Sequence, residues 1–419
     1  MELSYLQNCP ACGAPIQLSE GDRIIACEYC ESRNYMACRG PQRFVLPDTI
    51  GPQLVRGDVL YIPYLRFKGH IYSCLGEELD YKIVDTTQLG YDNRRLPASL
   101  GLRPQAMKVE QIGGRRRERF VRLNQKVVDI FNKAARLTSA FSRSSGVRRQ
   151  EARLYHRSFI GETISFIYLP TYFTNDTLMD GVLKRPITGR MDRQALLDRT
   201  VSCKKEWLPH FISARCPHCG AGMTSAADSL VQECHNCSTL WQEHGGVFRK
   251  IEYSFVDGGR DPLYLPFWRI RPRVHGGALR NFGDFVDLTN QPVVLSATQR
   301  EKPVTFWTPA FKIRPKEFLH IAKWLTMGQQ SLPAEGTRLQ RRIFPATLPS
   351  REAVQALKAV LTEAVLNKRA FIPTLPGLRL QAEKVDLVYL PFHALGQDLV
   401  QEHTRLAISR RVLYYGRTM

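Results

Sequence analysis

Apolar residues recur at helical spacing in several parts of the chain. The clearest example lies within residues 115–141, where apolar side chains follow one another at steps of three and four. This spacing places them on one face of an α-helix. We therefore predict a long helix here, a second amphipathic helix over residues 351–369, and shorter helices over residues 316–328 and 191–207. The apolar face of the first helix consists of Phe120, Leu123, Val127, Phe131, Ala134, Leu137 and Phe141.

Four other segments have the composition of β-strands, with aromatic and aliphatic residues around a Tyr-x-Pro sequence. Proline cannot donate a hydrogen bond to a neighbouring strand, so we expect each of these prolines at a sheet edge or a bulge. An exposed row of their aromatic rings would stack on bases. Packing of a sheet against a helix is the favoured interpretation. The segments are residues 59–69, 166–173, 262–272 and 387–395.

The same landmarks occur in the same order in both halves of the chain. The order is a four-cysteine segment, a Tyr-x-Pro strand, a Val-Asp-x-Thr segment, a Pro-Ala…Arg-Pro segment, a helix and another Tyr-x-Pro strand. In the Val-Asp-x-Thr segments we expect a turn at Asp85 in the first half and at Asp287 in the second. This order predicts an internal duplication with a boundary near residues 204–206. Because each half mixes helices and strands, the predicted fold class is α+β, with mainly antiparallel sheets and packed helices.

Eight of the eleven cysteines form two groups with the same spacing. Each group reads Cys-Pro-x-Cys-Gly-Ala, followed by a second Cys-x-x-Cys pair. Two such pairs supply the tetrahedral thiolate geometry that Zn²⁺ prefers, and four cysteines leave no open position for a substrate. We therefore expect two structural Zn²⁺ ions. Their predicted ligands are Cys9, Cys12, Cys27 and Cys30 in the first group and Cys216, Cys219, Cys234 and Cys237 in the second.

The two groups resemble zinc ribbons, which are also called rubredoxin-like knuckles. The order of the landmarks also resembles bacterial proteins in which a ribbon precedes Tyr-x-Pro-aromatic segments. The ribbon resemblance implies two small metal-stabilised modules, each at the start of one half. The predicted organisation is a first ribbon over residues 1–40, an α+β domain with the basic helix over 41–205, a second ribbon over 206–248 and a second α+β domain over 249–419.

Positive charge is concentrated in one segment of a basic chain. The formal net charge is +20, and the segment from Arg94 to Arg157 holds 17 basic residues and 4 acidic ones. Clustered arginine suits phosphate groups, which it binds through paired hydrogen bonds. An anionic membrane surface or an acidic protein would also suit it, and a solvated helix face is the plain alternative. The predicted polyanion-binding residues are Arg115, Arg116, Arg117, Arg119, Arg122 and Lys126.

Motifs typical of enzymes are missing from the sequence. We find no phosphate-binding Gly-x-x-x-x-Gly-Lys, no Gly-x-Gly-x-x-Gly, no His-Glu-x-x-His and no Gly-x-Ser-x-Gly. The N-terminal segment lacks the features of a signal peptide, and no apolar run is long enough to form a transmembrane segment. We therefore expect a cytoplasmic protein without catalytic activity, in which paired cysteines indicate metal rather than disulfides.

Two functional hypotheses of different classes follow. In the first, the protein is a non-catalytic, zinc-stabilised adaptor subunit of a larger assembly, and it binds nucleic acid or another polyanion through its basic segment. In the second, it is a protein–protein scaffold, including one placed at an anionic membrane surface. Bound nucleic acid after purification would support the first hypothesis, and a stoichiometric protein partner would support the second. An enzyme with an active site assembled from distant residues ranks third.

Overall fold

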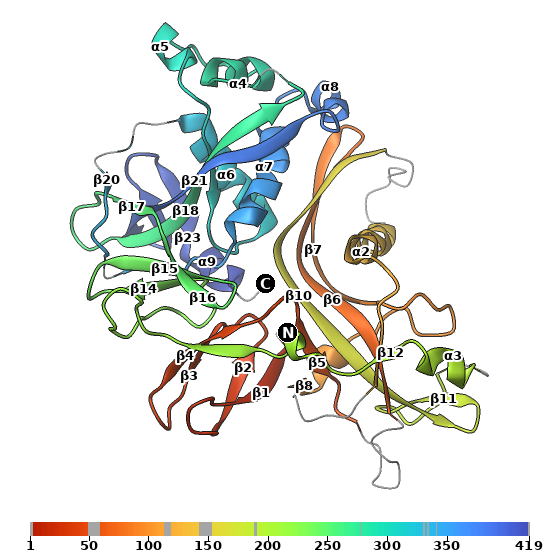
Figure 1. Cartoon of the computed structure of the whole chain (residues 1–419). Coiled ribbons are helices and arrows are strands. Elements are labelled where there is room, and N and C mark those ends of the chain that lie inside the picture. The colour runs from red at the N-terminus through yellow and green to blue at the C-terminus, as the bar shows by residue number, and fades with distance from the viewer. Residues whose placement is uncertain are drawn as a thin grey trace.

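The chain combines several β-sheets with shorter helical segments. The structure, a computed structural model, has about 20% helix and 42% strand, which confirms the mixed helix and strand content. Figure 1 shows the large sheet of the first half beside the large sheet of the second half. The described residues are 3–48, 59–112, 119–141, 153–187, 191–277, 279–329, 332, 335–340 and 342–417.

The first large sheet has ten strands within the described residues. They are β1 (Ser4–Asn8), β2 (Pro15–Ser19), β5 (Gln42–Val45), β6 (Leu60–Leu75), β7 (Glu78–Leu89), β8 (Val109–Gln111), β9 (Arg119–Val121), β10 (Leu154–Thr174), β11 (Thr177–Asp180) and β12 (Thr200–Val201). Their order is β12-β9-β6-β10-β5-β8-β1-β2, with β7 paired to β6 and β11 paired to β10. The long strands β6 and β10 pair antiparallel and form the centre of the sheet.

The second large sheet has seven strands within the described part of the chain. They are β17 (Tyr253–Val256), β18 (Leu263–His275), β19 (Phe306–Pro309), β20 (Glu335–Gly336), β21 (Arg379–Leu395), β22 (Asp398–Gln401) and β23 (Leu406–Ser409). Their order is β19-β18-β21-β17-β20, and β22 joins β21 to β23. The long antiparallel pair is here β18 and β21.

Two small sheets contain strands that lie within the cysteine groups or next to them. They consist of β3 (Ile24–Ala26), β4 (Arg33–Ala37) and β13 (His210–Ser213), and of β14 (Val231–Cys234), β15 (Thr239–His244) and β16 (Val247–Ile251). Strand β13 leads toward the second cysteine group but pairs with β4 beside the first group. The backbone N–H groups of Arg23 and Ile24 both donate to the carbonyl of Ala227, at 2.6 and 3.1 Å. The two cysteine-bearing segments are therefore packed against each other.

The helices that cover the sheets are mostly short. They are α1 (Arg103–Ala106), α2 (Val127–Phe141), α3 (Arg193–Leu197), α4 (Phe282–Thr289), α5 (Ala297–Arg300), α6 (Pro315–Gly328), α7 (Ser350–Ala364), α8 (Lys368–Phe371) and α9 (Arg410–Gly416). Single 3₁₀ turns lie at Lys205–Trp207 and Ile372–Thr374. The helix predicted over residues 316–328 is confirmed as α6. The helix predicted over 351–369 is confirmed as α7 up to Ala364, where extended backbone at Val365 ends it, and α8 is a separate short helix. Among the described helices, none combines the length and apolar character needed to span a bilayer.

The first part of the long basic helix was predicted wrongly. Arg119–Val121 is strand β9, which runs parallel to β6, and the helix begins only at Val127. The ring of Phe120 is fully buried and stacks on that of Tyr61 with centroids 5.0 Å apart. Pairing with a distant strand therefore determines the conformation of this segment. The predicted helix over residues 191–207 is likewise wrong beyond α3, because Thr200–Val201 forms β12 beside β9.

The Tyr-x-Pro prolines lie in interior strands, so the expected sheet-edge position is wrong. Each proline occupies the point where its strand changes its neighbour on one side. Pro63 lies between the pairings of β6 with β9 and with β7, and its carbonyl accepts the N–H of Gly90 at 2.9 Å. Since the missing N–H falls in a gap between two partners, no ladder hydrogen bond is lost. Corresponding changes of partner surround Pro170, Pro266 and Pro391.

The aromatic rings of these segments belong to the protein core. Tyr64, Tyr168 and Tyr389 are at most 2% exposed. The interpretation as sheet packing is therefore confirmed for them, and none of these rings is available to stack on bases.

The two Val-Asp-x-Thr segments adopt different structures, and the expected turns are wrong. Asp85 lies in β7, where its carboxylate accepts hydrogen bonds from Arg66 at 2.9 and 3.0 Å. Asp287 lies in α4, whose N-terminus is capped by the side chain of Asn281. A partner on the adjacent strand therefore stabilises the strand at Asp85, and a nearby capping residue stabilises the helix that contains Asp287.

Helix α7 lies between the two large sheets, whereas α2 covers β6 and β7 from the other side (Figure 1). A bulge interrupts the pairing of β10 with β6 between Ile160 and Thr163, and Gly161 takes a positive φ of 68° there. The carboxylate of Glu352, in the first turn of α7, accepts the N–H groups of Gly161 at 2.6 Å and Glu162 at 3.1 Å. Because Glu352 is only 2% exposed, this contact joins the halves inside the protein.

Candidate metal centres

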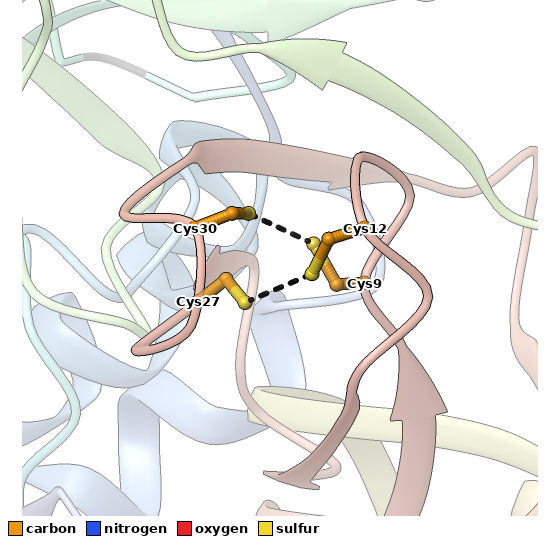
Figure 2. Close-up of side chains that lie close together, drawn as sticks. All are labelled: Cys9, Cys12, Cys27 and Cys30. Carbon is orange, nitrogen blue, oxygen red and sulfur yellow. Dashed lines mark hydrogen bonds between the residues drawn. The ribbon is translucent and has the colours of Figure 1, made fainter.

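The eight predicted ligands come together as two four-cysteine clusters. Within each cluster, all four sulfur atoms lie within 4.8 Å of one another. Figure 2 shows the first cluster, in which Cys9 faces Cys30 and Cys12 faces Cys27, with sulfur–sulfur distances of 3.7 and 3.6 Å. Four sulfurs at about 2.3 Å from a tetrahedral ion would be about 3.8 Å apart, whereas a disulfide is about 2.05 Å long. Both clusters can therefore hold a metal ion.

The second cluster repeats this geometry. The sulfur atoms of Cys216 and Cys237 are 3.6 Å apart, and those of Cys219 and Cys234 are 3.4 Å apart. All eleven cysteines of the chain are free thiols in the structure. The spacing thus favours a shared metal ion over covalent pairing in both groups.

Glycine allows the chain to turn back at the first Cys-x-x-Cys pair of each cluster. Gly13 has a φ of 80°, and its N–H donates to the carbonyl of Cys9 at 2.9 Å. Gly220 has a φ of 75° and makes the same bond to Cys216 at 2.9 Å. Glycine takes such left-handed angles without the steric cost that a Cβ atom brings. Both glycines therefore allow the tight turn that brings the two cysteines of the pair together.

A hydroxyl group lies beside the second Cys-x-x-Cys pair of each cluster. The hydroxyl oxygen of Ser32 is 3.1 Å from the sulfur of Cys30, and that of Thr239 is 3.0 Å from the sulfur of Cys237. These two residues were not predicted as part of the sites, although both follow the last cysteine of their cluster by two positions. A hydroxyl donor stabilises a thiolate, which is the form that binds metal.

The surroundings of the first cysteine in each cluster favour its thiolate form. Burial raises the pKa of Cys9, but backbone N–H groups of the same turn and the Ser32 hydroxyl outweigh burial and lower this pKa to about 6. Burial likewise acts on Cys216, and backbone N–H groups with the Thr239 hydroxyl bring its pKa to about 6. These surroundings suit a positive ion among the sulfurs.

The segment around the second cluster has little apolar core of its own. The separate apolar cluster around its cysteines consists of Cys216, Met223, Cys234 and Trp241, so two of its four buried members are candidate metal ligands. Val231 and Leu240 of the same segment pack into the core of the second half instead. The first segment relies on its neighbour, because the ring of Tyr35 packs edge-on against Phe248 of β16 with centroids 5.5 Å apart. Such small modules depend on metal for their stability.

The two histidines of the second segment lie outside the cluster. His218 and His235 are exposed, and the Nε2 atom of His235 is 3.3 Å from a carboxylate oxygen of Glu233. Both histidines are therefore surface residues. Among the described residues, the His, Cys, Asp and Glu groups with metal-ligand spacing are the two cysteine clusters.

The described part of the predicted basic segment is on the surface but does not form one helix face. Arg115, Arg116 and Arg117 lie outside the described residues. Arg119 lies in β9 and Arg122 just after it, so the predicted placement of both on one face of a helix is wrong. Both residues are exposed, as is Lys126 before α2.

The structure brings a further arginine to this place. The N–H of Arg122 donates to the carbonyl of Arg199 at 2.9 Å, next to the pairing of β9 with β12. Both residues line a surface hollow of about 540 Å³. Sequence reasoning missed Arg199 because only strand pairing shows its position. We call Arg119, Arg122, Lys126 and Arg199 the β9–β12 basic surface.

The two clusters share their sulfur spacing, their glycine turns and their hydroxyl contacts. They are therefore suited to the same kind of ion. Comparisons with protein-family models, with curated proteins and with solved structures found no match for this chain.

Proposed function

We propose that this protein is a non-catalytic adaptor subunit of a larger assembly, stabilised by two structural zinc ions, and that it binds nucleic acid or another polyanion. The observation that carries the proposal is the β9–β12 basic surface on a chain with a net charge of +20. Its four basic side chains are exposed and form no ion pair within the described part of the chain. They are therefore available to an external anion.

Zinc is the ion that best suits the two clusters. Four thiolates in a tetrahedron are the usual ligands of structural zinc, and such closed sites leave no position for a substrate. The sulfur–sulfur distances of 3.4 to 3.7 Å support this assignment. The ions would stabilise the two ribbons and take no part in chemistry.

An internal duplication accounts for the matching strand registers. In the first half, Tyr168 of β10 pairs with Pro63 of β6, and in the second half Tyr389 of β21 pairs with Pro266 of β18. In both halves a short parallel strand pairs with the long strand that carries this tyrosine. It is β5 beside β10 in the first half and β17 beside β21 in the second half. The carbonyl of Pro63 also accepts an N–H just beyond β7 at 2.9 Å, and the carbonyl of Pro266 accepts one just beyond β19 at 3.0 Å. These matches support a copied domain.

Phosphate groups suit the basic surface better than a neutral ligand would. Arginine offers a planar fork of N–H donors that matches phosphate oxygens. Backbone phosphates would fix the position of a nucleic acid without reading its sequence. We therefore expect binding that depends strongly on salt and weakly on base sequence.

Reversing the charge of the basic surface should weaken nucleic-acid binding. In the triple variant Arg119→Glu, Arg122→Glu and Arg199→Glu, we expect lower affinity for short DNA and RNA strands of every sequence at low salt. The log–log salt slope should flatten by about 0.9 for each duplex phosphate that the variant no longer neutralises. Fluorescence anisotropy measures both quantities, and the metal content should stay unchanged.

A matched control separates the local effect from the change in net charge. Arg249, Lys250 and Lys316 are exposed on other elements, and their replacement by glutamate changes the net charge by the same amount. This control should bind nearly as well as the parent. Equal weakening in both triple variants, or no binding by the parent, would contradict the nucleic-acid proposal.

A protein–protein scaffold is the second candidate, and exposed apolar side chains favour it. Val293 and Val294, between α4 and α5, are 46% and 98% exposed. Leu366 is 57% exposed, and its N–H donates to the carbonyl of Thr289 at the end of α4. Apolar side chains grouped on the surface are typical of protein contacts. Isolation of the protein with a stoichiometric partner and without nucleic acid would favour this function.

A further inference from the structure

A cavity with many polar residues lies where the two cysteine-bearing segments meet the first large sheet and the segments around α6, α7 and α9. Its volume is about 280 Å³. Asp22 and Asp228 belong to its wall on the side of the two cysteine segments, Thr163 comes from the β10 bulge, and Lys312 comes from the loop before α6. Arg417, next to α9, completes the lining; Figure 1 shows this end of the chain between the two sheets. The cavity is therefore built from segments far apart in the sequence.

The carboxylates in the wall of this cavity are mostly engaged within the protein. Asp22 accepts the backbone N–H of Ser19 at 2.7 Å, and three other carboxylates form ion pairs. A carboxylate that already has a cationic partner contributes little attraction for a further cation. The ion pairs are Glu20 with Arg66, Asp228 with Arg417 (Oδ2 to Nε, 3.1 Å) and Glu162 with Arg351 (3.5 Å).

Two cations of the wall have no carboxylate partner among the described residues. The ammonium group of Lys312 donates to the hydroxyl of Thr163 at 2.9 Å and forms no ion pair with a described residue. The guanidinium of Arg23 likewise has no carboxylate partner within the described ranges. Burial lowers the pKa of Lys312, and the nearby Glu352 only partly opposes this effect. A bound anion would stabilise the charged form of this lysine and so oppose the effect of burial on its pKa.

The local backbone also favours an anion. Helix α7 spans Ser350–Ala364, and Pro349, directly before it, lines the cavity. The N-terminus of a helix carries a partial positive charge. Together with Arg23 and Lys312, it adds positive potential to the lining of this partly enclosed cavity.

We propose that this cavity binds a small oxyanion with at least two negative charges, of the phosphate or polycarboxylate class. Its size suits a small molecule and excludes a nucleic-acid strand. Lys312 and Arg23 bind the anion through charge-assisted hydrogen bonds, which are the strong ones in a partly enclosed site. Since Arg23 belongs to the first ribbon segment and Lys312 to the second half, the anion joins the two halves and stabilises the protein.

Binding of inorganic pyrophosphate and of citrate to the full-length protein tests this proposal. At matched ionic strength, with sodium chloride as reference, we expect at least one of the two anions to raise the Tm and to bind in isothermal titration calorimetry. Binding of pyrophosphate alone identifies the phosphate class, binding of citrate alone identifies the polycarboxylate class, and binding of both supports the shared oxyanion chemistry.

Substitutions then locate the binding site. Lys312→Met keeps the length of the side chain and removes its charge, so the affinity should fall about tenfold or more. Arg23→Gln should lower the affinity to a similar extent, and it tests the site if Lys312→Met fails to fold. Lys316→Met, an exposed lysine of α6, is the matched control and should bind like the parent.

Two outcomes would overturn the proposal. They are the absence of any anion-specific Tm shift in the parent, and shifts that Lys312→Met and Arg23→Gln retain in full. The triple variant of the β9–β12 basic surface should still bind the anion, so failure of the nucleic-acid proposal would leave this site unaffected.

Discussion

The variant Cys219→Ser should retain one metal ion per chain and lose the order of the second ribbon. The apolar cluster around its cysteines has four buried members and two of them are candidate ligands, so little apolar packing remains there without the metal. In small zinc modules, metal binding supplies about 10–16 kcal/mol that is coupled to folding. Hydrogen exchange should accelerate over residues 216–241, while residues 9–37 keep most of their protection. Elemental analysis should fall from two ions to one.

Cys203→Ser is the matched control for this prediction. Cys203 is a partly buried thiol outside both clusters. Its replacement should leave two ions per chain and normal exchange in both ribbons. A Cys219→Ser protein that still holds two ions, or whose second ribbon exchanges as in the parent, would show that the cluster is not a metal site.

The variant Arg66→Met should destabilise the whole protein by about 3–5 kcal/mol. Arg66 is 0% exposed and pairs with Glu20, which is 3% exposed, and with Asp85. Without the guanidinium, the carboxylate of Glu20 would be buried with only the hydroxyl of Ser165 as a partner. An uncompensated buried charge is the cause of the expected loss of stability. The free energy of unfolding from urea titration measures it.

Two further variants test whether the loss of stability comes from the buried ion pair. Arg273→Met removes an exposed arginine, 64% exposed, whose partner Glu383 is 3.5 Å away, and should cost less than about 1 kcal/mol. The double variant Arg66→Met with Glu20→Gln should recover part of the lost stability, because the buried charge is gone. If Arg66→Met unfolds at the same urea concentration as the parent, the ion pair is not a stabilising contact.

Features set by local sequence were predictable. The spacing of the cysteines predicted both clusters, because ligand geometry depends on a few neighbouring residues. The helices α6 and α7 were predictable as well, since an apolar stripe on a surface helix is a local pattern. Gly13 and Gly220 could be assigned to turns because only their own φ angles were involved.

Features set by distant contacts were not predictable in the same way. Phe120 fits a helical stripe, yet pairing with β6 and β12 makes it part of a strand. Arg66 was part of a strand signal, and nothing near it showed that Glu20 would meet it in the interior. The polar cavity unites Arg23 with Lys312, which are separated by most of the chain. Only the folded arrangement reveals these neighbours.

Native mass spectrometry of the unmodified full-length protein tests the central claim most directly. Two zinc-stabilised ribbons predict one dominant species with the mass of the chain plus two zinc ions. Denaturation with a chelator should then release both ions and leave eight further thiols reactive. A folded protein without metal, or one whose mass shows that Cys9, Cys12, Cys27 and Cys30 have formed disulfides, would contradict the account.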